Sequence, residues 1–256
     1  MRGLGDKRVL VAGAATGIGA ATARRLGAAG ARLYLGDINI DGLRTVAKEI
    51  NDAGGSAVAA RFDLTDADSV EALVAGAVTE LGGLDGVANV AADLSPETLG
   101  NDGPLLDMDI AIWNRTLSAN LIGFALIGKH ALPHLIAAGG GAIVNTTSEA
   151  SRVGEPVRPA YAASKAGINA LTRHIASAYG KDGVRANCVS PGAVLSETGL
   201  ATLSREFRDQ LLAGTPLSRL GRPDDLASTI CFLLSDDASW VSGQVWSVNG
   251  GGVFRD

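Results

Sequence analysis

Several residue types that mark specialised proteins are scarce in this sequence of 256 residues. Only Cys188 and Cys231 are present, with no CxxC pair, so neither a disulfide framework nor a zinc site is expected. The 22 Lys and Arg residues are outnumbered by 27 Asp and Glu residues, which excludes the basic surface that binding of nucleic acid requires. We therefore expect a small-molecule partner and a reducing, cytoplasmic location.

Long hydrophobic runs are also missing. No uninterrupted apolar stretch reaches about eighteen residues, and the run before Gly13 covers only residues 9–12, so we expect neither a membrane span nor a signal peptide. The only histidines are His130, His134 and His174, and Pro133 separates the first two. This pattern lacks the spacing of a metal centre, so no metal is expected.

Apolar residues are plentiful, at 46% of the chain, and they occur in short runs. Val/Ile/Leu-rich runs predict strands at residues 8–12, 32–36, 57–62, 86–90, 142–146, 185–189 and 244–248. Stretches of helical period lie between them, at 17–29, 41–53, 67–81, 110–137, 161–180 and, in pieces, 199–234. This alternation predicts an α/β fold: one domain over residues 1–256 in which the strands form a parallel sheet with helices on both faces.

Two segments interrupt the alternation, at residues 93–104 and 193–215. Both follow predicted strands, and loops that leave the carboxyl ends of parallel strands line the ligand crevice of such folds. We expect both to be substrate loops. The second contains apolar residues at spacings that predict a short amphipathic lid, namely Val194, Leu195, Leu200, Leu203 and Phe207.

A glycine-rich turn follows the first predicted strand. Gly13, Gly17 and Gly19 have the spacing G-x-x-x-G-x-G and open the first helix. Without Cβ atoms, such a turn lets backbone N–H groups and a helix N-terminus approach a pyrophosphate. Because about 0.6 matches to this spacing are expected by chance, the strand-to-helix context carries the assignment. The alternative is a tight turn that binds no ligand.

Asp37 ends the second predicted strand, where a carboxylate would meet the adenosine ribose of a dinucleotide. It can accept hydrogen bonds from both ribose hydroxyls but repels a 2′-phosphate. Neither the turn nor Ile38 supplies a compensating basic residue. This favours NAD over NADP. The alternative is that Asp37 caps the next helix, which Asn39 or Asp41 could do equally well.

Tyr161 and Lys165 stand four residues apart at the start of a predicted helix. This spacing brings the ammonium near the phenol, where a positive charge would lower the pKa of the tyrosine and suit it to general acid/base work. Only about 0.06 such pairs are expected by chance, and the alternative is a solvated helix face. Ser148 ends a predicted strand thirteen residues earlier and could donate to a substrate oxygen. Alone, it would more often be a cap or turn residue.

Together these features resemble the short-chain dehydrogenase/reductase family. The matching motifs fall in family order across roughly residues 7–252: "GAATGIG" (13–19), Asp37, "FDL" (62–64), "ANVAA" (88–92), Asn120 in "SANLIG", Ser148, "YAASK" (161–165), "NCVSPG" (187–192) and "GQVWSVNGG" (243–251). The resemblance implies a Rossmann-type sheet of about seven parallel strands, nicotinamide-dependent oxidation of an alcohol or reduction of a carbonyl, and a homotetramer built on the helices at 110–137 and 161–180.

The resemblance also implies a catalytic set of Asn120, Ser148, Tyr161 and Lys165. Tyr161 would exchange the hydroxyl proton and Ser148 would orient the substrate oxygen. Lys165 would hold the nicotinamide ribose and lower the pKa of the tyrosine, while Asn120 would anchor a water that relays protons.

Cofactor contacts are implied along the whole chain. Asp63 and Leu64 would meet the adenine, Asn89 and Ala91 the adenosine end, and residues 191–194 the nicotinamide. The full set is Gly13, Thr16, Gly17, Ile18, Gly19, Asp37, Ile38, Asp63, Leu64, Asn89, Ala91, Tyr161, Lys165, Pro191, Gly192, Val194 and Ser196.

Two departures from the family pattern replace polar residues by apolar ones. Ala12 stands where the family usually has Thr, and Val90 stands at the second position of its Asn-Asn-Ala-Gly motif. We expect Ala12 and Val90 to face each other across adjacent strands in an apolar site.

The sequence thus predicts an NAD-dependent oxidoreductase acting on a secondary alcohol or ketone. No spacing directs Arg152, Arg158 or Arg205 inward as a clamp for an anion, so we expect an uncharged, largely apolar substrate. Glu149 could contact either substrate or solvent. The alternatives are an NADPH-dependent reductase of an acyl-carrier or similar carbonyl substrate, and a dinucleotide-binding sensor without turnover.

Overall fold

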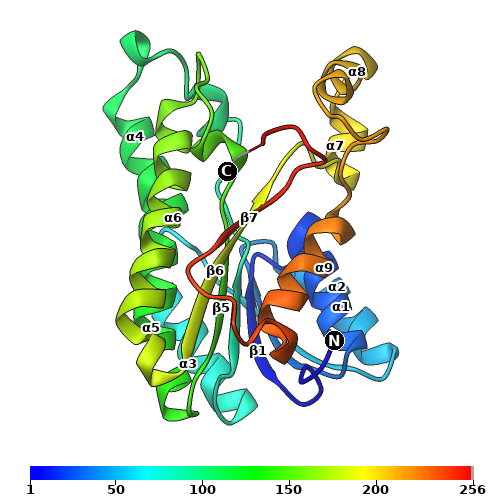
Figure 1. Cartoon of the computed structure of the whole chain (residues 1–256), viewed down its shortest axis with the longest axis vertical. Coiled ribbons are helices and arrows are strands. Elements are labelled where there is room, and N and C mark those ends of the chain that lie inside the picture. The colour runs from blue at the N-terminus through cyan, green and yellow to red at the C-terminus, as the bar shows by residue number, and fades with distance from the viewer. Residues whose placement is uncertain (255–256) are drawn as a thin grey trace.

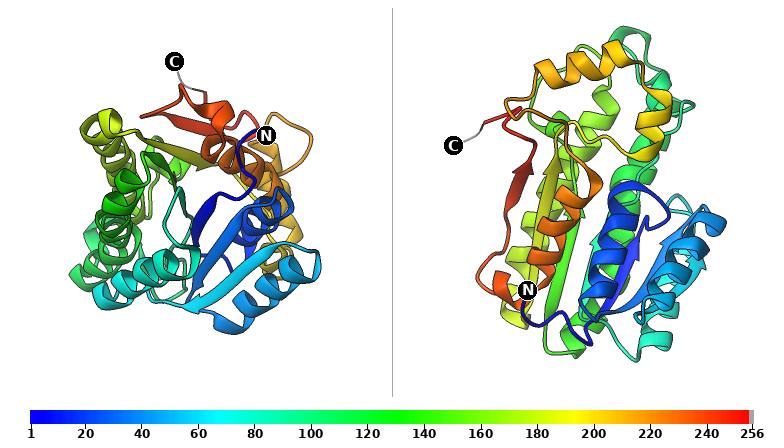
Figure 2. Two further views of the ribbon diagram at one scale, coloured as in Figure 1. Left: turned by 90° about the horizontal axis from the view of Figure 1, so that it is seen from below. Right: turned by 90° about the vertical axis from the view of Figure 1, so that its right-hand side faces the viewer.

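A seven-stranded parallel sheet forms the centre of the protein (Figures 1 and 2). The computed structural model describes residues 1–254. The strand order is β3-β2-β1-β4-β5-β6-β7, and every neighbouring pair is parallel. The strands are β1 (Arg8–Ala12), β2 (Arg32–Asp37), β3 (Ser56–Arg61), β4 (Gly86–Asn89), β5 (Gly141–Thr146), β6 (Val184–Pro191) and β7 (Val245–Val248). The predicted fold class is confirmed.

Helices cover both faces of the sheet (Figure 1). One face carries α1 (Gly17–Ala28), α2 (Ile40–Asp52) and α9 (Pro223–Leu234), and the other carries α3 (Ala67–Leu81), α5 (Gly123–Ala137) and α6 (Pro159–Tyr179). Shorter helices are α4 (Ile110–Leu117), α7 (Glu197–Thr202) and α8 (Arg205–Ala213), and the 3₁₀ turns are η1 (Leu99–Asn101), η2 (Leu105–Asp107), η4 (Glu149–Ser151), η5 (Gly180–Asp182) and η6 (Asp236–Ala238).

The core has two parts, one on each side of the sheet, because successive side chains of a strand point to opposite faces. In β1, Val9 and Val11 belong to one hydrophobic cluster and Leu10 and Ala12 to the other. Val90 packs against the cluster that contains Val9 and Val11. The expectation that Ala12 and Val90 face each other is therefore wrong. The residue beside Ala12 in the register is Asn89.

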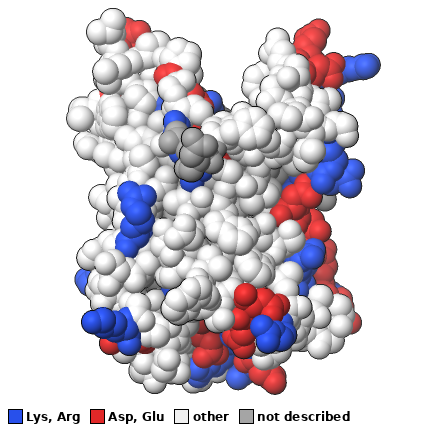
Figure 3. All heavy atoms as spheres, in the orientation of Figure 1, with Lys and Arg blue, Asp and Glu red and all other residues white. Residues whose placement is uncertain are grey.

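The site is positioned where the strand order reverses, since β1 lies between β2 and β4. In parallel sheets the ligand crevice opens at the carboxyl ends of the strands at this point. Two projections rise at that edge, one containing α4 and the other α7 and α8 (Figure 1). Figure 3 shows a notch between them, with most of the charged side chains on this face lying below the notch or at the outer edges.

One long helix runs through α4, the π-helical turn η3 (Ser118–Ile122) and α5. Among the described residues, this Ile110–Ala137 helix is the one long and apolar enough to cross a membrane by length and composition, and 33% of its most apolar window is buried. Core helices of soluble proteins pass the same test. Here the helix packs against α3 and α6 beside the sheet, as a core helix does.

Candidate active site

The glycine turn lies at one end of the crevice, and a side chain would not fit at Gly13 or at Gly19. Gly13 has φ +89°, and a Cβ there would lie 2.4 Å from the backbone nitrogen of Ala91. A Cβ on Gly19 would lie 1.8 Å from the carbonyl oxygen of Gly13. The Thr16 side chain makes no capping hydrogen bond at the start of α1. The helix N-terminus and the open turn therefore fit the pyrophosphate of a dinucleotide.

Asp37 is held in the crevice by two backbone N–H groups. Its Oδ2 accepts a hydrogen bond from Ala15 N at 2.9 Å, and its Oδ1 accepts one from Asn39 N at 2.9 Å. The cap of α2 is Asn39, whose Oδ1 accepts from Gly42 N at 3.1 Å. The alternative in which Asp37 caps this helix is thus wrong. The fixed carboxylate keeps lone pairs for ribose hydroxyls.

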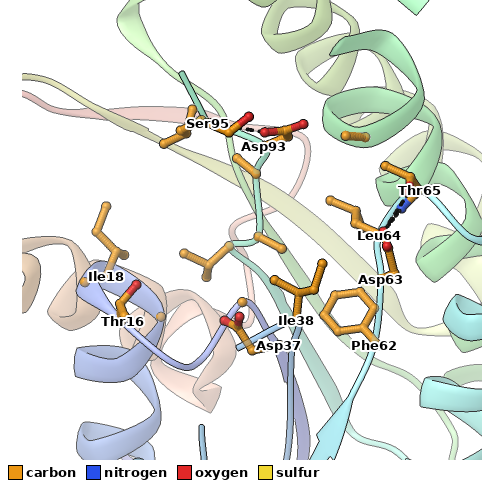
Figure 4. A pocket seen from close by; sticks show the side chains of 18 of the residues that line it. Thr16, Ile18, Asp37, Ile38, Phe62, Asp63, Leu64, Thr65, Asp93 and Ser95 are labelled. Carbon is orange, nitrogen blue, oxygen red and sulfur yellow. Dashed lines mark hydrogen bonds between the residues drawn. The ribbon is translucent and has the colours of Figure 1, made fainter. Parts of the chain in front are cut away.

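A cavity of about 930 Å³ occupies the crevice and is large enough for a dinucleotide. In Figure 4, Thr16 and Ile18 lie on one side, Phe62 to Thr65 on the opposite side, and Asp93 and Ser95 at a third edge. Twelve of the predicted cofactor contacts line this cavity: Gly13, Thr16, Gly17, Ile18, Gly19, Asp37, Ile38, Asp63, Leu64, Ala91, Val194 and Ser196.

Five predicted cofactor contacts do not line the cavity, namely Asn89, Tyr161, Lys165, Pro191 and Gly192. Asn89 is buried within the sheet, where its Nδ2 donates to Asn145 Oδ1 at 2.8 Å. Pro191 ends β6, and Gly192 N donates to the Val248 carbonyl oxygen at 3.2 Å. Sequence reasoning in turn did not name eleven lining residues as cofactor contacts, although several lie in the quoted motifs or in the 93–104 loop: Phe62, Thr65, Val90, Ala92, Asp93, Leu94, Ser95, Arg115, Ser118, Ala119 and Pro223.

The structure brings Tyr161 and Ser148 together. Burial raises the pKa of the Tyr161 phenol above its ordinary value, and a hydrogen bond with Ser148 partly offsets this by lowering it. Ser148 also caps η4, because its Oγ accepts a hydrogen bond from Ala150 N at 3.2 Å. The expectation that Ser148 is a cap or turn residue is therefore confirmed, and its hydrogen bond with Tyr161 places it beside the predicted acid/base.

Lys165 differs from expectation. Its Nζ donates to the Thr146 carbonyl oxygen at 3.1 Å and lies 5.7 Å from the centroid of the Tyr161 ring. The lysine is 2% exposed, and burial lowers its own pKa to about 8. The expected lowering of the Tyr161 pKa by this ammonium is not found, because burial raises that pKa and the lowering contributions come from Ser148 and Arg158. The solvated-face alternative is also wrong, since Lys165 is buried.

Asn120 lies in the π-helical turn η3 and is fully buried. Such single π turns inside α-helices are frequent at functional sites. Its Oδ1 accepts from Asp93 N at 2.8 Å, and its Nδ2 donates to the Asp93 carbonyl oxygen at 3.2 Å. The side chain of Asn120 is thus bound to the first residue of the 93–104 loop.

Asp93 holds that end of the loop with its own carboxylate. Burial raises the pKa of Asp93, but hydrogen bonds from Ser95, Arg115 and Thr98 outweigh burial and bring the pKa to about 2. Because Asp93 is ionised at neutral pH, it forms an ion pair with Arg115 at 2.8 Å. This places an arginine of α4 on the wall of the cavity, which the sequence did not predict.

Glu149 follows Ser148 and is 8% exposed. Within the described residues, neither of its two buried carboxylate oxygens has a hydrogen-bond partner. The alternative in which Glu149 contacts only solvent is therefore not met. A buried carboxylate normally requires hydrogen-bond donors, so Glu149 is suited to a substrate group or water that supplies them.

The predicted lid forms α7 and α8, but its apolar residues do not all face inward. Val194 lines the cavity, whereas Leu200 is 51% exposed and Phe207 is 46% exposed. Hence the apolar residues of the expected lid only partly cover the crevice. Ser196 caps α7 by accepting from Gly199 N at 3.1 Å, and it also lines the cavity.

None of the three arginines considered from the sequence lines the cavity. Arg152 donates to Ser247 Oγ and to the Val245 carbonyl oxygen, Arg158 pairs with Glu155, and Arg205 lies 3.8 Å from Asp209. Among the described residues, no group of three or more His, Cys, Asp or Glu side chains could hold a metal ion.

The fold and the crevice together define a Rossmann-type protein with a dinucleotide-shaped site and a Ser-Tyr-Lys cluster beside it. Comparison with known proteins agrees. The sequence pattern described as "Enoyl-(Acyl carrier protein) reductase" matches residues 13–252. The chain is 43% identical to cis-4-hydroxycyclohexanecarboxylate dehydrogenase of Sinomonas cyclohexanicum, over 96% of each chain.

It is also 36% identical to 7alpha-hydroxysteroid dehydrogenase of Escherichia coli (strain K12), over 98% of this chain and 95% of that protein. A solved structure of 7α-hydroxysteroid dehydrogenase, in complex with NADH and 7-oxo glycochenodeoxycholic acid, matches with a TM-score of 0.91 and 35% identity, covering 98% of this chain and 96% of that chain. The chain belongs to the short-chain dehydrogenase/reductase family, as the motifs predicted.

Proposed function

We propose that the protein is an NAD-dependent dehydrogenase that interconverts a secondary alcohol and its ketone. The observation that carries the proposal is the cluster in which the Tyr161 phenol bonds Ser148 and lies beside the buried Lys165. When bound, the nicotinamide supplies the acceptor or donor of a hydride. The polypeptide supplies the proton transfer and the orientation of the substrate oxygen.

In this proposal Tyr161 takes the hydroxyl proton of the alcohol or returns it to the ketone oxygen. Ser148 holds that oxygen with a hydrogen bond where negative charge develops. Lys165 provides a buried cation beside the phenol, and its lowered pKa of about 8 lets it exchange a proton near neutral pH. The Asn120 side chain is hydrogen-bonded to Asp93, so it would hold in place the water that relays protons from the site to solvent.

NAD is favoured over NADP because the Asp37 carboxylate lies at the end of β2, where the ribose hydroxyls would bind. Its two backbone hydrogen bonds hold the carboxylate toward the cavity. A 2′-phosphate placed there would meet a negative charge. The NADH in the matched 7α-hydroxysteroid dehydrogenase structure supports the same choice.

The substrate class we propose is a secondary alcohol on a saturated ring. Two relatives by name oxidise such alcohols, a hydroxycyclohexanecarboxylate and a 7α-hydroxysteroid. Notably, the first of these bears a carboxylate, whereas the sequence predicted an uncharged substrate. If an anion is bound, Arg115 is the arginine on the cavity wall, although it is already paired with Asp93. We therefore retain the uncharged ring alcohol.

The test is a panel of ring alcohols and ketones assayed with NAD(H) and with NADP(H). Cyclohexanol and cis-4-hydroxycyclohexanecarboxylate form a matched pair that differs by one carboxylate. We expect turnover with NAD and a higher kcat/KM for the neutral member. A preference of tenfold or more for the anionic member would overturn the uncharged assignment. A protein that binds NADH but turns over no member would instead be the sensor without turnover.

We further propose a homotetramer built on α5 and α6. Support comes from the long helix that continues into α5, which leaves Ile110 of α4 70% exposed and Ile122 of η3 51% exposed, although Phe124 of α5 and Ile168 of α6 are buried. Sedimentation at micromolar concentration should show a tetramer, and a monomer would contradict this assembly.

A further inference from the structure

The 93–104 loop is attached to α6 by Asp102, a residue that is 2% exposed. Its Oδ2 accepts a hydrogen bond from Tyr161 N at 2.7 Å, and its Oδ1 accepts one from Ala160 N at 3.2 Å. The Asp102 carbonyl oxygen also accepts from Arg158 N at 2.8 Å. Asp102 therefore accepts three hydrogen bonds from backbone N–H groups at the start of α6, the helix that carries Tyr161.

This first turn has no cap of its own. The residue before the helix is Arg158, which has φ +66° and makes no side-chain capping bond. Pro159 follows and has no N–H group. The first backbone donors of α6 are thus on Ala160 and Tyr161, and an aspartate 58 and 59 residues away satisfies both.

The other end of the loop is attached to Asn120. Asp93 makes two backbone hydrogen bonds with the Asn120 side chain, and its carboxylate bonds Arg115. One loop therefore joins two members of the implied catalytic set that lie on different helices. Movement at the Asp102 end would displace Tyr161 relative to Ser148, which comes from the end of β5.

We propose that Asp102 is a positioning residue for Tyr161, which fixes the start of α6 so that the phenol meets Ser148 and the substrate oxygen. This inference rests on the proposed function, because it takes Tyr161 as the acid/base. Misplacement of a reacting group by about 1 Å can cost about a hundredfold in rate. The effect belongs to turnover, since Asp102 does not line the dinucleotide cavity.

The test replaces Asp102 in the full-length protein. We expect Asp102→Ala to lower kcat by about tenfold to a hundredfold, with the Kd of NADH within about twofold of wild type. Asp102→Asn keeps one acceptor oxygen but turns an NH2 group toward the other N–H donor, so we expect its kcat to lie between those of Asp102→Ala and wild type. The matched control is Asp66→Ala, because Asp66 caps α3 in the same way by accepting from Asp68 N and Ser69 N.

The ionisation of Tyr161 gives a readout that does not depend on turnover. Each variant is titrated with pH by ultraviolet absorbance, with and without the additional change Tyr161→Phe. The difference between the two curves is the titration of Tyr161. Arg158 lowers and Glu155 raises the Tyr161 pKa, the Lys165 ammonium lies beside the ring, and the Ser148 hydrogen bond lowers the pKa. Weakening the Ser148 bond in Asp102→Ala should shift the titration to higher pH, whereas Asp66→Ala should not shift it.

Each outcome decides between positioning and a general structural role. Wild-type kcat and an unshifted titration in Asp102→Ala would overturn the proposal, as would losses equal to those of Asp66→Ala. If Asp102→Ala does not fold, Asp102→Asn is used for the test. A lower melting temperature of Asp102→Asn, together with a kcat and a tyrosine titration equal to those of wild type, would overturn the proposal. Failure of the proposed function is distinguishable, since wild type itself would then turn over no alcohol.

Discussion

The two sides of the crevice are built differently. On the dinucleotide side, the Gly13 turn, the start of α1 and Asp37 lie within about 25 residues of one another, and Asp37 accepts a hydrogen bond from the backbone of that turn. The catalytic side is assembled from β5, α6, the π turn and the 93–104 loop, which meet through side chains such as Asn120 and Asp102. Local backbone geometry thus positions the glycine turn and Asp37, whereas long-range side-chain contacts position the residues of the proposed catalytic set.

Asp37→Arg should give the largest effect on the dinucleotide side. The substitution removes a negative charge that repels a 2′-phosphate and adds a group that can pair with it. We expect the ratio of kcat/KM for NADP to that for NAD to rise by about a hundredfold. Asp41→Arg makes the same charge change at a carboxylate whose side chain is 89% exposed and should leave the ratio unchanged. Equal turnover of both cofactors by wild type would contradict the role given to Asp37.

The second prediction concerns Lys165, on the catalytic side, and the dependence of the unfolding free energy on pH. Its pKa in the folded protein is about 8, below the ordinary 10.5, because burial disfavours the charged form. The folded protein therefore releases this proton at lower pH than the unfolded chain, so the cost of burying the charge is full below pH 8 and is relieved as pH rises toward 10.5.

The unfolding free energy of wild type relative to Lys165→Met should therefore increase by about 2 kcal/mol between about pH 7 and pH 9.5. Lys48→Met is the matched control, because the Lys48 side chain is 74% exposed. Denaturant titrations at several pH values measure both. A flat difference between wild type and Lys165→Met would show that the buried ammonium is compensated by its surroundings.

The smallest effect concerns Ala12, between the two sides. Asn89 lies beside Ala12 in the register, and the Oδ1 of Asn89 is buried without a hydrogen-bond partner among the described residues. A threonine hydroxyl at position 12 could donate to this oxygen, whereas the equally shaped valine could not. We expect Ala12→Thr to be more stable than Ala12→Val by about 1 kcal/mol. Equal unfolding free energies would place the hydroxyl out of reach of Asn89.

The sequence predicted the sheet closely because each strand is a short apolar run between turn residues. All seven strands lie within two residues of their predicted bounds, and α3 has its predicted range of Ala67–Leu81. The glycine turn and Asp37 were also predicted, because the conformations of Gly13 and Gly19 and the hydrogen bond of Asp37 depend on residues nearby in the sequence.

The catalytic side was predicted only in part. Tyr161 and Lys165 have a characteristic spacing, but the hydrogen bonds of Asp102 and Asp93 depend on a loop folding onto helices that follow it in the chain. No periodicity encodes such contacts. Likewise, the raised pKa of Tyr161 depends on burial, which the distance to Lys165 along the helix does not reveal.

The most direct test of the account is the turnover of Tyr161→Phe with NAD and a ring alcohol that wild type oxidises. Removing one hydroxyl should lower kcat by about a hundredfold or more and leave the Kd of NADH within about twofold, because only proton transfer is lost. Tyr179→Phe, at the other end of α6, should keep wild-type turnover. If Tyr161→Phe retains more than about a tenth of the wild-type kcat, Tyr161 is not the acid/base.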